Sequence, residues 1–239
     1  MPSPAQRHRA RVMALKAQAQ SEHGQAVESS AYDLMLAQLA EHRRRLHSIQ
    51  SVQQKIEVKR QIVSEYDAWI DAALQEGNGA QDLVITTLMI WHIDAGNYGR
   101  ALEIGAYVLV HGLQMADQYR RSPAVVLIDE ISGAYLRGLV PAGSEAVELL
   151  QAVNRLTMTI DAPDQARAKL KKAIGYALLG KVKTGETPDL DKFDQAALEA
   201  IQRWLETALG LDANCGVKKD LERIERRINA LRAAGAQST

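Results

Sequence analysis

Apolar residues recur in steps of seven along residues 31–64, which contain neither Gly nor Pro. This spacing predicts one helix of about 34 residues, about 50 Å long, with a coiled-coil-like seam. Polar residues interrupt the seam at His42, Gln53 and Arg60. We predict that a second copy packs on it; the alternative is a helix that folds back on its own domain. The predicted interface residues are Leu39, Leu46, Ile49, Ile56 and Val63.

Shorter helical patterns fill the rest of the chain, and glycines or prolines mark several of their ends. Ser3 and Pro4 are typical of a helix start, for a helix that runs to about Gln20. Residues 21–30 are expected to be a flexible connection. Residues 125–128 have the composition of a strand, but no partner strand is evident, so we predict an all-α fold. The other predicted helices span residues 81–94, 98–111, 123–139, 144–159, 163–179, 194–209 and 216–232.

Part of the pattern resembles the corner between helices of a tetratricopeptide repeat. Trp91, Gly96, Tyr98 and Ala101 form one such corner, and residues 208–212 resemble the end of another. The two matches are incomplete and do not repeat every 34 residues or so. We therefore predict helical hairpins for residues 77–239. They follow two other predicted segments: residues 1–30, a basic segment and linker, and residues 31–76, a long helical oligomerisation segment.

Composition narrows the class of protein. The single cysteine, Cys215, excludes a disulfide framework and the usual cysteine-based zinc site. No apolar run approaches the ~20 residues that span a bilayer, and the amino terminus lacks a signal-peptide core. We expect a soluble cytoplasmic protein with no membrane partner.

The chain has 29 basic and 29 acidic residues, so its net charge is zero. The zero results from basic segments and acidic segments that cancel each other. Residues 1–20 carry four basic residues and no acidic one, whereas residues 65–119 are strongly acidic. Local basic blocks can still contact phosphates, so we predict that residues 1–30 are a DNA-contacting segment and linker. The alternatives are a disordered tail for the first block and a solvated helix face for the second. In order of preference, the candidate DNA contacts are Arg7, Arg9, Arg11 and Lys16, then Arg43, Arg44 and Arg45, then Lys169, Lys171 and Lys172.

Motifs that suggest catalysis are incomplete. Residues 175–182 spell most of a phosphate-binding loop, but Val182 replaces the Mg²⁺-binding Ser or Thr, and a helix that ends at Gly180 is the better interpretation. The acidic pairs lack the downstream acid-x-Lys or His-rich pattern of common nucleases, and the six histidines are scattered. We predict no catalytic residue, metal site or cofactor in this chain.

Several segments, in the same order over nearly the whole chain, resemble the small terminase subunit of Peduovirus-type tailed phages and prophages. They include residues 3–8, Gly79-Ala80-Gln81-Asp82, residues 101–104, residues 112–115, Pro163-Asp164 and Gly216-Val217-Lys218-Lys219. None of these segments is a chemical motif by itself. Their joint order is what makes the resemblance specific.

The resemblance implies a protein of viral genome packaging in the cytoplasm of an infected or lysogenic bacterial host. Such subunits recognise the packaging (cos) site on double-stranded phage DNA, assemble as homo-oligomeric rings, and recruit or regulate the large subunit, which carries the ATPase and nuclease. Members are often labelled the terminase endonuclease subunit. Two alternatives stay open: this chain itself cleaves cos DNA, or it is a protein-only helical scaffold.

Overall fold

The computed structural model describes residues 3–27, 29–116, 120–182 and 186–236, with side chains up to residue 234. Within these ranges the chain forms helices and no strand, and its one isolated bridge pairs Ala26 with Gln81. The prediction of an all-α fold is therefore confirmed. The chain divides into two compact units, Met1–Val126 and Leu127–Thr239, which we call unit 1 and unit 2. All of the first two predicted segments and the start of the third fall in unit 1.

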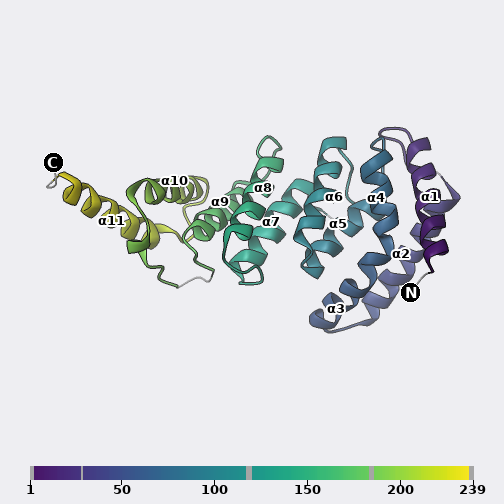
Figure 1. Cartoon of the computed structure of the whole chain (residues 1–239), viewed down its shortest axis with the longest axis horizontal. Coiled ribbons are helices and arrows are strands. Elements are labelled where there is room, and N and C mark those ends of the chain that lie inside the picture. The colour runs from purple at the N-terminus through teal and green to yellow at the C-terminus, as the bar shows by residue number, and fades with distance from the viewer. Residues whose placement is uncertain (1–2, 28, 117–119, 183–185, 237–239) are drawn as a thin grey trace. The chain divides into compact units, whose positions relative to one another are not determined.

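Unit 1 is a set of helices (Figure 1) that pack around buried apolar side chains. α1 packs on α4, α3 on α5, and α5 on α6. Large side chains that are fully buried in this core include Tyr66, Ile70, Ile85 and Leu88. The elements are α1 (Pro4–Gln20), α2 (Ser30–Ser48), α3 (Val52–Ile62), the 3₁₀ helix η1 (Val63–Tyr66), α4 (Asp67–Glu76), α5 (Leu83–Ala95) and α6 (Tyr98–His111).

The amino-terminal helix begins where its sequence predicts. Ser3 Oγ accepts a hydrogen bond from the Gln6 backbone N–H at 3.3 Å, and Gln6 Oε1 accepts one from the Ser3 N–H at 2.7 Å. This reciprocal capping box satisfies backbone donors that the first turn leaves open. Further along, the small side chains of Ala14 and Ala17 are buried, which lets α1 approach α4 closely.

The prediction of one helix over residues 31–64 is wrong, because the chain turns between α2 and α3 (Figure 1). Ile49 is extended, with φ −86° and ψ 130°. Ser48 Oγ donates to the Arg45 carbonyl at 2.8 Å, and Ser51 Oγ accepts from the Gln54 N–H at 3.3 Å. Serine side chains compete in this way with helical backbone bonds and favour helix ends. The steps of seven therefore run across a turn and do not mark one continuous stripe.

The predicted hairpin between residues 81 and 111 is confirmed as α5 and α6. Gly96 ends α5 at φ +85°, a left-handed conformation that glycine adopts without a Cβ clash. Ala101 is fully buried on α6, where α5 and α6 meet.

The connection between α1 and α2 makes backbone contacts that its sequence did not suggest. Gly24 N–H donates to the Gly79 carbonyl at 3.1 Å, and Val27 N–H donates to the Gln81 carbonyl at 3.2 Å. The connection is thus paired with the segment that precedes α5.

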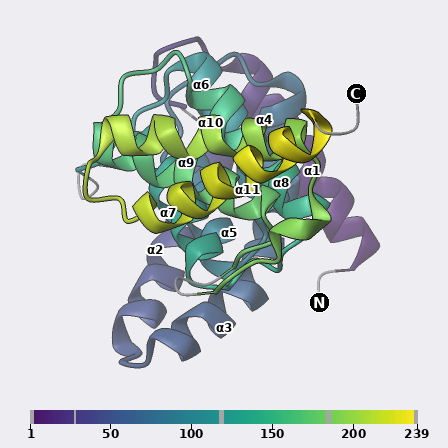
Figure 2. The same ribbon diagram turned by 90° about the vertical axis from the view of Figure 1, so that its left-hand side faces the viewer.

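Unit 2 consists mainly of α8 (Ser144–Thr157), α9 (Asp164–Leu178), η2 (Leu190–Lys192), α10 (Gln195–Leu211) and α11 (Lys218–Ala236). α7 (Pro123–Leu136) begins in the last residues of unit 1, so residues 125–128 are helical as predicted. α9 packs on α8 and α10, and α10 lies beside α11 (Figure 2). At Gly175 a Cβ atom would lie 2.5 Å from Leu205 Cδ2, so this glycine allows α9 and α10 to pack closely.

Candidate nucleic-acid interface

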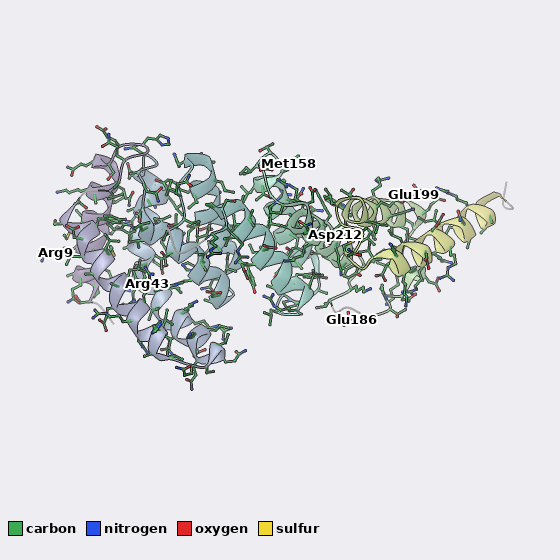
Figure 3. All side chains as sticks on the ribbon, turned by 180° about the vertical axis from the view of Figure 1, so that it is seen from behind. Arg9, Arg43, Met158, Glu186, Glu199 and Asp212 are labelled. Carbon is green, nitrogen blue, oxygen red and sulfur yellow. The ribbon has the colours of Figure 1, made fainter. Side chains whose placement is uncertain are left out.

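α1 presents four cationic side chains to solvent: Arg7, Arg9, Arg11 and Lys16. Within the described part of the chain, none of the four forms a hydrogen bond or an ion pair through its side chain. At 100° per residue, Arg9 and Lys16 share one face of the helix, separated by ~10 Å along its axis. Arg7 and Arg11 share another face, and Figure 3 shows Arg9 at the outer edge of α1. The set is therefore free to meet a polyanion.

The carboxyl-terminal half of α1 is held in place by the buried carboxylate of Asp82, which is 1% exposed. Asp82 Oδ2 accepts from Gln18 Nε2 at 3.2 Å and from Trp69 Nε1 at 2.8 Å. Its Oδ1 accepts the backbone N–H groups of Val84 and Ile85, which makes Asp82 the N-cap of α5. Burial raises the pKa of Asp82, although all four hydrogen bonds oppose that shift.

One carboxylate therefore joins α1, α4 and α5 in unit 1. Sequence reasoning missed this role. The available signal was an Asp directly before the apolar run of residues 83–93. An aspartate in that position is typical of a helix cap, but its partner at residue 18 has no local signature.

The second candidate set, Arg43, Arg44 and Arg45, is exposed on α2. Figure 3 labels Arg43 of this set. Arg44 Nη2 lies 2.5 Å from Glu41 Oε2, with side chains 75% and 66% exposed. An exposed ion pair of this kind stabilises by about 0–1 kcal/mol, so Arg44 can exchange its partner. By contrast, the neighbouring cations of α3 are engaged: Lys59 pairs with Asp94, and Arg60 Nε donates to the Ala95 carbonyl at 3.1 Å.

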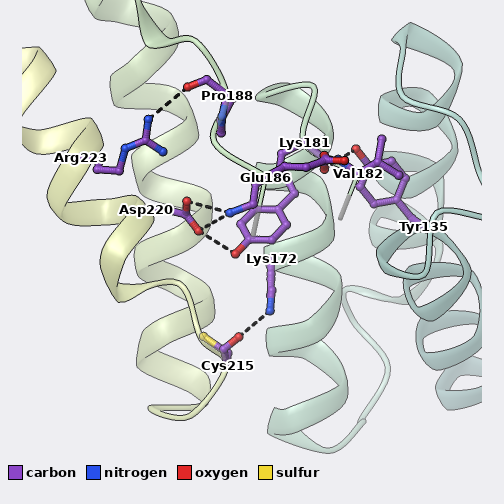
Figure 4. Close-up of polar contacts among 10 residues, drawn as sticks. Tyr135, Lys172, Lys181, Val182, Glu186, Pro188, Cys215, Asp220 and Arg223 are labelled. Carbon is purple, nitrogen blue, oxygen red and sulfur yellow. Dashed lines mark hydrogen bonds and ion pairs between the residues drawn. The ribbon is translucent and has the colours of Figure 1, made fainter. Parts of the chain in front are cut away.

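The third candidate set lies on α9, where the structure gives each lysine a packing contact within unit 2. Lys169 Nζ donates to Asp129 Oδ1 at 2.6 Å, and Lys171 Nζ to Asn154 Oδ1 at 2.7 Å. Lys172 Nζ donates to the Cys215 carbonyl at 2.8 Å (Figure 4). Burial lowers the pKa of both Lys171 and Lys172. A DNA contact by these lysines stays a prediction, and it would compete with the packing of α9.

The five predicted interface residues divide into two groups. Leu39, Leu46 and Val63 are buried within unit 1, at 3%, 7% and 3% exposure. Their packing agrees with the alternative in which this segment folds back on its own domain. Ile49 and Ile56 are only partly buried, so they are the members of the set that a second copy could contact.

The loop-like segment at residues 175–182 forms no phosphate cradle. Gly180, at φ +68°, follows the end of α9, as predicted. Lys181 is 4% exposed, and its Nζ donates to both carboxylate oxygens of Asp220 at 2.8 and 2.7 Å (Figure 4). Tyr176 OH also donates to Asp220 at 2.8 Å. Lys181 therefore holds α11 against the end of α9.

The described residues contain no group of three or more His, Cys, Asp or Glu side chains placed to hold one metal ion. No helix within them is long and apolar enough to cross a membrane. Cys215 is partly buried, and burial raises the pKa of its thiol.

Fold and surface together define an all-helical protein whose first helix offers uncommitted cations to a polyanion. The sequence profile of the phage small terminase subunit family matches residues 36–165, more than half of the chain. The terminase, endonuclease subunit of Escherichia phage P2 is 38% identical over 229 residues, which cover 95% of this chain and 86% of that protein. No solved structure matches the chain. The chain belongs to the phage small terminase subunit family, which confirms the resemblance found in the sequence. Membership of this family gives the chain a role in phage DNA packaging.

Proposed function

We propose that this chain is the DNA-recognising subunit of a phage terminase and that α1 contacts the packaging (cos) site on double-stranded viral DNA. The observation that carries the proposal is the set of four exposed cations on α1. Their side chains have no partner among the described residues, and they lie on a helix that buried contacts hold in place. Neutralising phosphates with Lys and Arg releases condensed counterions, which favours binding. Because α1 is already folded and docked, less ordering is needed on binding than for a disordered tail.

Assembly into a ring would multiply this weak site. When one copy of α1 binds the DNA, the other copies on the same homo-oligomer are held close to it at a high effective concentration. The oligomer therefore binds DNA more tightly than a single chain does. Ile49 and Ile56 are the proposed contact residues between copies, and Arg43, Arg44 and Arg45 of α2 are proposed as secondary DNA contacts. In the same role, the chain would recruit or regulate the large ATPase-nuclease subunit in the cytoplasm of the host bacterium. The exposed acidic residues Glu65, Asp67 and Glu76 are the proposed contacts for that subunit.

Binding to duplex DNA tests the proposal. The full chain is titrated with a packaging-site duplex and with a scrambled duplex of equal length. We expect the site duplex to bind more tightly, and a variant with Arg7→Gln, Arg9→Gln, Arg11→Gln and Lys16→Gln to lose at least about tenfold in affinity at low salt. The matched control removes four exposed cations outside α1 and outside the groove of unit 2 described below: Arg120, Arg137, Arg155 and Arg203. Equal losses in the two variants would contradict a specific role for α1.

The phage P2 relative is named an endonuclease subunit, which favours a second candidate function, in which this chain itself cleaves cos DNA. Incubation of the purified chain with Mg²⁺ and site-bearing DNA, without the large subunit, separates the two. Our proposal predicts intact DNA. Sustained cleavage at the site would establish the second candidate, and failure to bind either duplex at low salt would favour a protein-only scaffold.

A further inference from the structure

Three arginines of α11 line a groove in unit 2. Arg223, Arg226 and Arg227 are spaced i, i+3 and i+4, so they lie on one face of the helix. The opposite wall is formed by residues 187–191, which include η2 and two carboxylates, and the groove has a volume of about 510 Å³. None of these residues belongs to the sets predicted from the sequence.

Each guanidinium keeps most of its N–H donors free of partners within the described part of the chain. Arg223 Nη2 donates to the Pro188 carbonyl at 3.3 Å (Figure 4), and Arg226 Nε donates to the Glu222 carbonyl of its own helix at 3.2 Å. Arg227 Nη2 lies 3.2 Å from Asp191 Oδ1, while Arg227 Nε is buried without an acceptor in the described structure. A guanidinium has five N–H donors, so the three side chains can still bind an anion in the groove.

The acidic wall does not neutralise this set. Asp189 Oδ1 accepts the Asp191 N–H at 3.0 Å, and Asp189 also has a cation of its own, with Lys192 Nζ at 3.9 Å. Asp191 is the only acid of the wall for which an ion pair with α11 is described, and its side chain is 77% exposed. A solvated carboxylate holds a guanidinium weakly, so a stronger anionic acceptor can displace it.

The cationic face extends beyond the groove. Lys219 lies one turn before Arg223 on the same face and is exposed. From Lys219 to Arg227 the face measures ~12 Å along the helix axis. Phosphates follow each other about every 3.4 Å of axis on each strand of a duplex, so this length suits several phosphates of one polymer better than one free anion.

We propose that this groove binds the phosphodiester backbone of duplex DNA and that Asp191 occupies the place of a phosphate until DNA arrives. Arginine and phosphate form short, charge-assisted and often bidentate hydrogen bonds, which replace the exposed ion pair with Asp191. The inference rests on the proposed function, because it adds a second DNA contact to a chain that binds DNA through α1. Asp191 thereby lowers the affinity of the free protein for DNA.

Two pairs of charge-matched variants of the full chain test the groove. Asp191→Asn should raise the affinity for the packaging-site duplex at least about threefold, whereas Asp212→Asn, with the same change of charge outside the groove, should not. Arg226→Gln should lower the affinity at least about threefold, whereas Arg203→Gln on α10 should not. Among the described residues, Arg226 forms a side-chain hydrogen bond to its own helix alone, so its replacement should leave the fold intact.

The α1 variant, measured in parallel, separates the two proposals. Loss of binding in the α1 variant, with each groove variant equal to its control, would overturn the groove and leave the proposed function standing. No binding by the native chain at low salt would overturn both. Competitors test the ligand: inorganic phosphate, at the same phosphate concentration as the DNA, should not displace the duplex. Polyglutamate that displaced it from the native chain but not from Arg226→Gln would overturn the assignment to nucleic acid.

Discussion

Gln18 and Asp82, 64 residues apart, meet through a buried hydrogen bond from Gln18 Nε2 to Asp82 Oδ2. This contact fixes the helix that carries the proposed DNA contacts. Gln18→Ala should lower the free energy of unfolding of unit 1 by about 2 kcal/mol, because it removes a donor from a buried carboxylate. It should also speed amide hydrogen exchange along α1.

Gln20→Ala is the matched control, since Gln20 is exposed on the same helix. Exchange and urea unfolding are measured on the full chain, with 5-fluorotryptophan NMR to separate the units. Trp69 and Trp91 report unit 1, and Trp204 reports unit 2. Equal exchange in α1 for the two variants would show that Gln18 does not hold the helix.

His92 should make unit 1 sensitive to acid. The residue is 3% exposed, and burial, with a smaller contribution from Arg100, lowers the pKa of its imidazole from 6.5 to about 4. Between these values the unfolded chain binds a proton that the folded chain does not, so stability falls as the pH drops from about 6.5 to about 4. The loss contributed by His92 can reach about 3 kcal/mol.

Urea unfolding of unit 1 at pH 7 and pH 4.5 measures this loss. His92→Leu should reduce the pH dependence, whereas His47→Gln, at an exposed position on α2, should leave it unchanged. The same acid sensitivity in His92→Leu as in the native chain would assign the effect to other groups.

The buried ion pair of Lys181 with Asp220 should stabilise unit 2 against unfolding. Lys181→Met leaves the Asp220 carboxylate buried without its cation, and the loss of one partner of a buried pair costs about 3–5 kcal/mol. The Trp204 resonance should therefore report unfolding of unit 2 at a lower urea concentration. Lys192→Met removes an exposed lysine, 75% accessible, and should cost little. A midpoint for Lys181→Met equal to that of Lys192→Met would contradict the structural role.

Ile49 and Ile56 test the proposed assembly. Glutamate at both positions should shift the native mass toward monomer while unit 1 stays folded, because both side chains are only partly buried. Leu34→Glu is the control, since Leu34 is 60% exposed on α2 and outside the proposed contact. Native mass spectrometry reads the outcome. An unchanged assembly with both glutamates would place the contact between copies elsewhere.

Most helix ends could be predicted from local sequence signals. Ser3 with Gln6 at the start of α1, and Gly96 after α5, act through neighbouring backbone groups, so their sequence context suffices to predict them. The turn at Ile49 was missed because no Gly or Pro marks it. It depends on serine side chains that are tolerated in helices and also favour their ends.

For the candidate DNA contacts, the sequence predicted which residues are cationic but not which of them are paired with other groups of the chain. The sequence shows the lysines of α9, but their acceptors lie far along the chain: Asp129 is 40 residues before Lys169, and the Cys215 carbonyl is 43 residues after Lys172. Whether a cation is free or engaged depends on tertiary contacts of this kind. For the same reason, the sequence alone did not indicate that the arginines of α11 line a groove with residues 187–191.

The salt dependence of DNA binding tests the central claim most directly. The observed association constant for the packaging-site duplex is measured at several salt concentrations for the native chain and for the variant with the four α1 cations replaced by glutamine. Each lost phosphate contact should flatten the plot of log K against log salt by about 0.9, so the account predicts a slope shallower by up to about 3.6 per chain. Coincident plots for the two proteins would show that α1 does not contact the DNA.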